Sequence, residues 1–142
     1  MNTLKKGDKV TVLFVCKNNS IRSQMAEAIL NSFYSETHTS FSGGLEPKNI
    51  NKNTIKVLKE IKINISSKKP KNIEIFKNTE FDHVITVCED EKCPYFLNGK
   101  NYIYKKFKDP EYSPKSEHLN SFREIRDEIK NWIIRIVEEG VI

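Results

Sequence analysis

The sequence predicts an α/β fold in which a four-stranded parallel sheet is flanked by helices. Strand-like apolar runs alternate with segments whose apolar residues recur at helical spacing. This alternation favours parallel pairing, because parallel strands need crossover connections that place helices on the faces of the sheet. Ligands of such sheets bind beyond the carboxyl ends of the strands. The residues that follow each strand are therefore the candidate functional residues.

The first half of the chain contains two strand–helix units. Residues 10–15 form a buried strand, and apolar residues at helical spacing follow it: Ile21, Met25, Ala28, Ile29 and Phe33. A second short strand at residues 38–42 ends at the pair Gly43-Gly44, and a helix starts near Asn51. Both units have the order that a parallel sheet requires.

The second half of the chain continues the alternation. Residues 73–76 form a short helix, residues 83–87 a third strand that ends at Cys88, and residues 102–107 a fourth strand. The last segment is the clearest helix, because it has an apolar stripe of period 3.6, formed by Leu119, Phe122, Ile125, Ile129, Trp132, Ile133, Ile136 and Val137.

The composition predicts a globular protein. The 142 residues fit a single domain, residues 1–142, and 37% hydrophobic and 30% charged residues are ordinary for a globular chain. The apolar runs are strand-sized and the start of the chain is polar, so we expect neither a signal peptide nor a membrane span, and a cytoplasmic location. The net charge of +5 comes from scattered lysines, which disfavours a nucleic-acid partner but suits a small anion. We expect a monomer.

The segment "CKNNSIRS" carries the strongest functional signal. Five residues separate Cys16 from Arg22, between a strand and a helix. Such a loop can wrap around an oxyanion with its backbone N–H groups pointing inward, and the helix N-terminus and the guanidinium favour a nucleophilic thiolate. Cys16 alone would suit a buried small residue and Arg22 a solvated one, but together they predict a nucleophile in an oxyanion-binding loop of Lys17, Asn18, Asn19, Ser20, Ile21, Arg22 and Ser23.

The other two cysteines allow several interpretations. An odd number of cysteines argues against a structural disulfide framework. Cys88 at a strand end could approach Cys16 or be an inert core thiol, and Cys93, in a charged loop, could be reactive or incidental. The two could also be half of a metal site, but the three histidines lack zinc-like spacing to them. We therefore predict no metal site and no bound cofactor.

The stretch "VLFVCKNNSIRSQMAEAIL" resembles the anion loop of the low-molecular-weight protein tyrosine phosphatases and of the thioredoxin-coupled arsenate reductases, which share a fold. The resemblance covers nearly the whole chain, through "SFSGG", "INIS" and "DHVITVC" to "KDP" and "FREIRDEIKNWI". It implies a low-molecular-weight phosphatase-like, Rossmann-like three-layer sandwich. Many members have glycine where this chain has Asn18, which suggests a positive φ at that position.

The resemblance also implies roles for individual residues. Asp109 of "KDP" matches the general acid that protonates a leaving oxygen. Cys16, Cys88 and Cys93 match the three thiols of an arsenate reductase relay, of which typical phosphatases lack the second and third. We therefore expect reduction of arsenate to arsenite, with thioredoxin or a similar dithiol protein as the reductant.

Two alternatives remain beside the reductase. The first is a phosphatase that hydrolyses phosphotyrosine or small phosphate esters through a phospho-cysteine. Phosphatases usually have aromatic residues directly after Asp-Pro, whereas this chain has Glu111 and only then Tyr112. The second alternative is an oxyanion-sensing or adaptor module, against which the joint presence of Cys16, Arg22 and Asp109 argues.

Some reductases of this family hold a potassium ion beside the anion loop. The residues that match three of its ligands are Asn19, Glu27 and Ser42, but the position of the fourth ligand, an aspartate, falls on Lys71. A lysine cannot bind a cation. Our hypothesis is that the Lys71 ammonium takes the place of the ion and pairs with Glu27; the alternative is that Lys71 is a solvated loop lysine and that the match is shifted by one residue.

Overall fold

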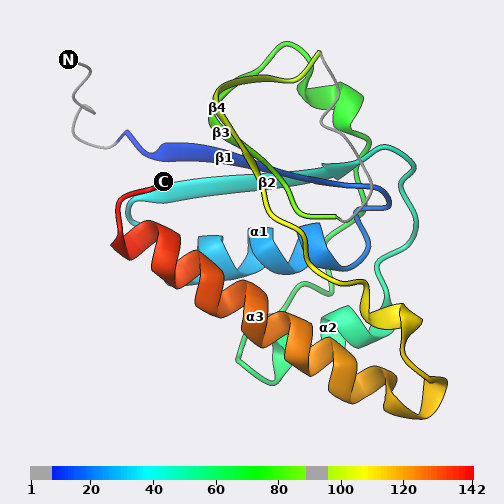
Figure 1. The fold of residues 1–142 in the computed structure, drawn as a ribbon. Coiled ribbons are helices and arrows are strands. Elements are labelled where there is room, and N and C mark those ends of the chain that lie inside the picture. The colour runs from blue at the N-terminus through cyan, green and yellow to red at the C-terminus, as the bar shows by residue number, and fades with distance from the viewer. Residues whose placement is uncertain (1–7, 89–95) are drawn as a thin grey trace.

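The computed structural model describes residues 8–88 and 96–142, and its sheet confirms the predicted fold class. The strands are β1 (Val10–Cys16), β2 (His38–Gly44), β3 (Glu80–Thr86) and β4 (Asn98–Tyr104). They pair in the order β2-β1-β3-β4, and every pair is parallel (Figure 1). The carboxyl ends of all four strands therefore meet at one edge of the sheet, with β1 and β3 in the middle.

The three α-helices lie on one side of the sheet, below it in Figure 1. They are α1 (Arg22–Phe33), α2 (Lys52–Lys59) and α3 (His118–Glu138). The 3₁₀ turns η2 (Pro110–Tyr112) and η3 (Lys115–Glu117) lead into α3, and η1 (Ile73–Phe76) lies on the other side of the sheet. Within the described ranges, none of the helices combines the length and the apolarity that crossing a bilayer requires.

The third and fourth strands begin earlier than the sequence pattern suggests. β3 starts at Glu80 rather than at residue 83, and β4 spans Asn98–Tyr104 rather than residues 102–107. β4 is an edge strand whose side chains are mostly exposed, so its pairing rests on backbone hydrogen bonds and leaves little hydrophobic pattern. Phe107 is buried for another reason, because its ring packs edge-to-face on Trp132 with centroids 5.6 Å apart.

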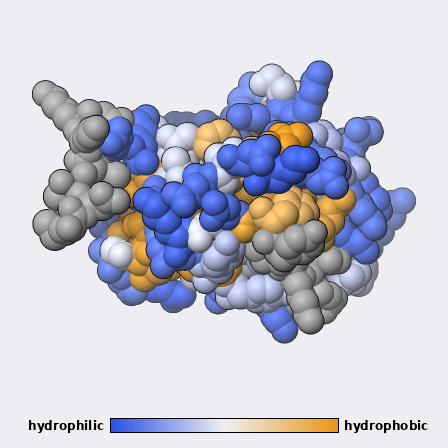
Figure 2. All heavy atoms as spheres, turned by 90° about the horizontal axis from the view of Figure 1, so that it is seen from above, coloured by the Kyte–Doolittle hydropathy of each residue, from blue (hydrophilic) through white to orange (hydrophobic). Residues whose placement is uncertain are grey.

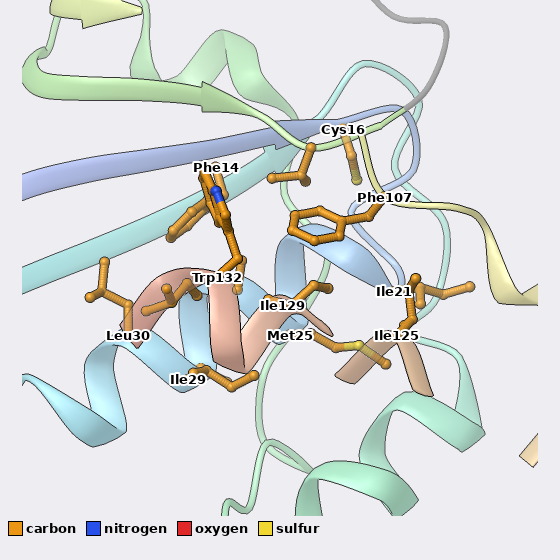
Figure 3. Close-up of a cluster of buried hydrophobic side chains, with 14 of the residues drawn as sticks. Phe14, Cys16, Ile21, Met25, Ile29, Leu30, Phe107, Ile125, Ile129 and Trp132 are labelled. Carbon is orange, nitrogen blue, oxygen red and sulfur yellow. The ribbon is translucent and has the colours of Figure 1, made fainter. Parts of the chain in front are cut away.

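The core has two parts, one on each face of the sheet. The larger part lies between the sheet and the helices and includes the fully buried Phe14, Met25 and Ile129 (Figure 3). Phe122 of α3 is fully buried in the same cluster. Burial of one such side chain contributes about 1.5–3 kcal/mol relative to its exposed state. The smaller part lies between the sheet and η1. The surface on this side of the molecule, seen in Figure 2, is mostly hydrophilic, with hydrophobic patches between the polar side chains. β1 is therefore packed on both faces and forms a rigid base for the residues that follow it.

His38 and His83 predict how stability depends on pH. Both imidazoles are buried, and burial lowers the pKa of each below its ordinary value of 6.5. The unfolded chain therefore binds more protons near pH 6, so the free energy of unfolding should fall as the pH drops below 6.5, by at most about 1.4 kcal/mol per pH unit for each histidine. Urea unfolding between pH 5 and 8 measures this slope. The double variant His38→Gln, His83→Gln should flatten it, and an unchanged slope in that variant would contradict the assignment.

Candidate active site

The anion loop connects the central strand β1 to helix α1. Cys16 is the last residue of β1 and Arg22 the first of α1, so the predicted loop spans the carboxyl end of the sheet. Cys16 is 3% exposed and belongs to the larger core, where Figure 3 shows it near the end of β1, in the same cluster as Phe107 and Ile21. The nucleophile predicted from sequence therefore lies at the end of a central strand, at the edge of the sheet where ligands bind.

Two polar groups contact the Cys16 sulfur. The Ser23 hydroxyl lies 2.8 Å from Sγ, and the backbone N–H of Asn19 donates to Sγ over 3.2 Å. A hydroxyl and an amide that donate to sulfur stabilise its anionic form, and the N-terminus of α1 adds a positive partial charge. The site can therefore present Cys16 as a nucleophile.

The left-handed residue of the loop is Asn19, so the expectation of a positive φ at Asn18 was wrong. Asn19 has φ of +50° and is fully buried. Its amide nitrogen donates to Ser23 Oγ and Ser42 Oγ, and its Oδ1 accepts from Gln24 Nε2 and from the backbone N–H of Lys71. Asparagine tolerates this left-handed backbone conformation. The turn directs the backbone N–H of Asn19 at the Cys16 sulfur.

The segment after β2 holds the outer side of the loop. It forms hydrogen bonds with loop carbonyls from Glu46 N–H to Lys17 O, from Lys48 N–H to Asn18 O, and from Asn51 N–H to Ser20 O. Because a trans peptide points its C=O and the next N–H in opposite directions, these carbonyls face outward and the following amides face the sulfur side. A Cβ on Gly44 would lie 2.7 Å from Lys17 O, so this close approach requires glycine.

Arg22 and Asp109, both predicted from sequence, lie together on the wall of the site. Arg22 Nη1 donates to Phe107 O over 2.8 Å, and its Nη2 lies 3.8 Å from Asp109 Oδ2. The Asp109 side chain also caps η2 by accepting from Glu111 N–H. The cavity they enclose has a volume of about 240 Å³ and is lined by Cys16, Asn18, Ser20, Ile21, Arg22, Lys48, Asn49, Asn51, Asp109 and Glu111.

Cys88 lies after the end of β3, the strand that pairs with β1. It follows β3 by two residues, is 2% exposed and belongs to the same buried cluster as Cys16. β3 is the direct neighbour of β1, and Val87 N–H donates to Val15 O. Cys93 lies outside the described residues.

Several contributors to the site were not recognised in the sequence. Gly44, Gln24 and the Phe107 carbonyl position the loop and Arg22, whereas Lys48 and Asn51 line the cavity. The pair Gly43-Gly44 at a strand end was the one local signal for close backbone contact. The other contributors depend on contacts between segments distant in sequence, which spacing does not reveal.

The residues beside the loop do not fit a potassium ion. Ser42 Oγ donates to Glu27 Oε1 over 2.6 Å, while Lys71 Nζ lies 3.6 Å from Oε1 and Lys68 Nζ 3.5 Å from Oε2. The buried Glu27 carboxylate thus already has two ammonium groups beside it, and Asn19 Oδ1 already accepts two hydrogen bonds. An additional cation would meet repulsion there.

This geometry predicts an enzyme that does not respond to potassium. Activity and melting temperature should stay constant when potassium replaces sodium at fixed ionic strength, because the charge of Glu27 is compensated within the chain. Lys71→Asp, which supplies a fourth oxygen group, should gain a saturable response to potassium, whereas Lys77→Asp serves as the surface control. A clear, saturable gain in the unmodified protein would contradict the prediction.

The chain is similar to known proteins over most of its length. The profile of the low molecular weight phosphotyrosine protein phosphatase family matches residues 11–139. An arsenate reductase of Bacillus cereus (strain 03BB102) is 35% identical over 135 residues, which cover 94% of this chain and 98% of that protein.

Two solved structures superpose on this chain over most of its length. An arsenate reductase in the phosphate binding state superposes with a TM-score of 0.80 at 28% identity, covering 92% of this chain and 98% of that one. A thioredoxin-dependent arsenate reductase of Corynebacterium glutamicum superposes with a TM-score of 0.72 at 28% identity, covering 92% of this chain and 61% of that one.

Proposed function

The chain belongs to the low molecular weight phosphotyrosine protein phosphatase family, and we propose that within this family it is an arsenate reductase regenerated by thioredoxin or a similar dithiol protein. One observation carries the choice of reaction. A second thiol, Cys88, is buried in the same cluster as the nucleophile Cys16, at the end of the neighbouring strand. Hydrolysis has no use for a second thiol, whereas reduction of arsenic needs one to supply electrons.

The first step forms a bond between sulfur and arsenic. The Cys16 thiolate, held by Asn19 N–H and Ser23, attacks arsenate bound by the loop amides and Arg22. One arsenic–oxygen bond breaks, and Asp109 gives its proton to the departing oxygen. The product is an arsenic(V) adduct on Cys16.

The next steps move two electrons to arsenic and then out of the site. The Cys88 thiolate attacks Sγ of Cys16, a disulfide forms, and the electron pair of the sulfur–arsenic bond reduces arsenic to arsenite. Cys93 then attacks Cys88, which frees Cys16 and leaves a Cys88–Cys93 disulfide. The dithiol partner reduces that disulfide, so the reaction needs no bound redox cofactor, and it suits the reducing cytoplasm.

The alternative function is a phosphatase acting on phosphotyrosine or small phosphate esters. The anion loop suits phosphate as well as arsenate, since both are tetrahedral oxyanions. Tyr112, the first aromatic residue after Asp109, does not support this alternative. Its side chain is 75% exposed and borders a different cavity, whereas Glu111 lines the cavity that contains Cys16. A phosphotyrosine ring would therefore lack an aromatic wall there.

A coupled assay tests the proposal. Purified protein, thioredoxin, thioredoxin reductase and NADPH are mixed with arsenate, and NADPH oxidation is followed beside hydrolysis of p-nitrophenyl phosphate. We expect arsenate-dependent NADPH oxidation that greatly exceeds phosphatase turnover. Efficient hydrolysis without arsenate-dependent oxidation would support the phosphatase instead.

A further inference from the structure

Three polar side chains that line the active-site cavity, Lys48, Asn51 and Glu111, are more exposed than the buried Cys16 and are here called the rim. Lys48 and Asn51 come from the segment between β2 and α2, and Glu111 comes from η2. Asn51 Nδ2 donates to Glu111 Oε2 over 3.3 Å, so the two sides of the rim are in contact. The proposed reaction assigns no role to any of these residues.

The rim is held in place by the anion loop itself. Lys48 N–H donates to Asn18 O, and Asn51 N–H donates to both O and Oγ of Ser20. Ser20 Oγ also donates to Asn49 O over 2.9 Å. Residues 48–51 therefore form a fixed wall whose position is coupled to the loop that binds the anion.

Lys48 is a cation available to a ligand. Within residues 8–88 and 96–142, no carboxylate lies within ion-pair distance of its ammonium group, whereas Arg22 is engaged by Phe107 O and lies near Asp109. The cavity also contains the carboxylates of Asp109 and Glu111. A dianion that enters must overcome their negative charge, and Lys48 supplies a compensating positive charge.

The rim residues line the same cavity as Asp109, the proposed proton donor to the oxygen that leaves. Cys16 is buried whereas Asp109 is partly exposed, so in the proposed in-line reaction the oxygen would depart from the buried sulfur toward solvent. In a free inorganic oxyanion this oxygen carries at most a proton, whereas in an ester it carries the organic group. Asn51 and Glu111 give such a group a polar, bridged wall, and the described lining of the cavity includes no aromatic side chain.

We propose that the rim determines specificity, because Lys48 binds one oxygen of a free inorganic oxyanion while the Asn51–Glu111 contact excludes organic esters. This inference rests on the proposed function and narrows its substrate class to inorganic dianions. Lys48 acts in binding rather than in bond breaking. Its loss should therefore weaken affinity and spare most of the chemistry.

Inorganic phosphate is the probe that tests Lys48 without any need for turnover. Lys48→Gln should weaken phosphate binding, measured by calorimetry, by about tenfold, which is the size expected for one charge-assisted hydrogen bond. The KM for arsenate should rise by a similar factor with most of kcat retained. Lys59→Gln, an exposed lysine outside the cavity, makes the same charge change as a control. Equal phosphate affinities of the two variants would overturn the role of Lys48.

Variants of Asn51 and Glu111 test whether the rim excludes organic esters. Glu111→Ala and Asn51→Ala should each raise the ratio of kcat/KM for p-nitrophenyl phosphate to kcat/KM for arsenate by about tenfold, because the bridge is lost. Glu117→Ala removes one exposed carboxylate outside the cavity and should leave the ratio unchanged. An unchanged ratio in both rim variants would overturn the exclusion. Failure of the proposed function gives a different result, since the unmodified protein would then not reduce arsenate at all.

Discussion

Cys16→Ser should abolish arsenate reduction, lowering kcat by at least about 10⁴-fold. The serine hydroxyl is a far weaker nucleophile than a thiolate and cannot form the disulfide that carries electrons away from arsenic. The variant should stay folded, because serine has a similar size and its hydroxyl can contact Ser23 and Asn19 N–H as the sulfur does. Phosphate binding measured by calorimetry should persist, which separates loss of chemistry from loss of the site.

Arg22→Lys should lower kcat/KM by about 10²–10³-fold in the same assay. A lysine cannot donate to Phe107 O and bind two substrate oxygens in one plane, as the guanidinium can. Arg135→Lys, an exposed arginine near the end of α3, provides the matched control and should behave like the unmodified protein. Substantial turnover by purified Cys16→Ser would contradict every catalytic role proposed above, whereas near-normal turnover by Arg22→Lys would remove only the guanidinium clamp.

The sequence alone predicted those parts of the site whose residues are close together in the chain. Cys16 and Arg22 lie on consecutive elements joined by one short loop, so their spacing was enough to predict that they border the same loop. Asp109 follows the fourth strand, and parallel pairing brings the ends of all strands to one edge. The rule that ligands bind at this edge is consistent with Asp109 lying near the loop, whereas its role as a general acid was implied by the family resemblance.

The parts that the sequence did not reveal depend on contacts between distant segments. The left-handed turn falls on Asn19 because the backbone there must aim its N–H at sulfur while the side chain joins β2, α1 and Lys71. The rim residue Lys48 reads as one surface lysine among many until the backbone contact with Asn18 places it at the cavity. β4 was misplaced because an exposed edge strand pairs through its backbone and leaves no hydrophobic alternation to detect.

The second large prediction concerns the relay of Cys88 and Cys93. These two cysteines are needed only if the reaction transfers electrons to arsenic. Cys93→Ser should complete one turnover, release one equivalent of arsenite and then stop as a Cys16–Cys88 disulfide. Cys88→Ser should stop earlier, with arsenic(V) bound to Cys16 and no arsenite released. Steady-state turnover of both variants with thioredoxin should fall by at least about 10³-fold, since each variant lacks one of the two thiols that the proposed relay uses after Cys16.

Peptide mass spectrometry and arsenite quantification distinguish these two stops. After single-turnover mixing with arsenate, a digest of Cys93→Ser should contain the linked Cys16 and Cys88 peptides, whereas Cys88→Ser should contain none. Hydrolysis of p-nitrophenyl phosphate supplies the internal control, because it needs Cys16 and Asp109 but neither later cysteine, so both variants should keep whatever phosphatase rate the unmodified protein has. If both variants reduce arsenate repeatedly at the unmodified rate, electrons do not pass through Cys88 and Cys93, and the buried position of Cys88 beside β1 is then a matter of packing alone.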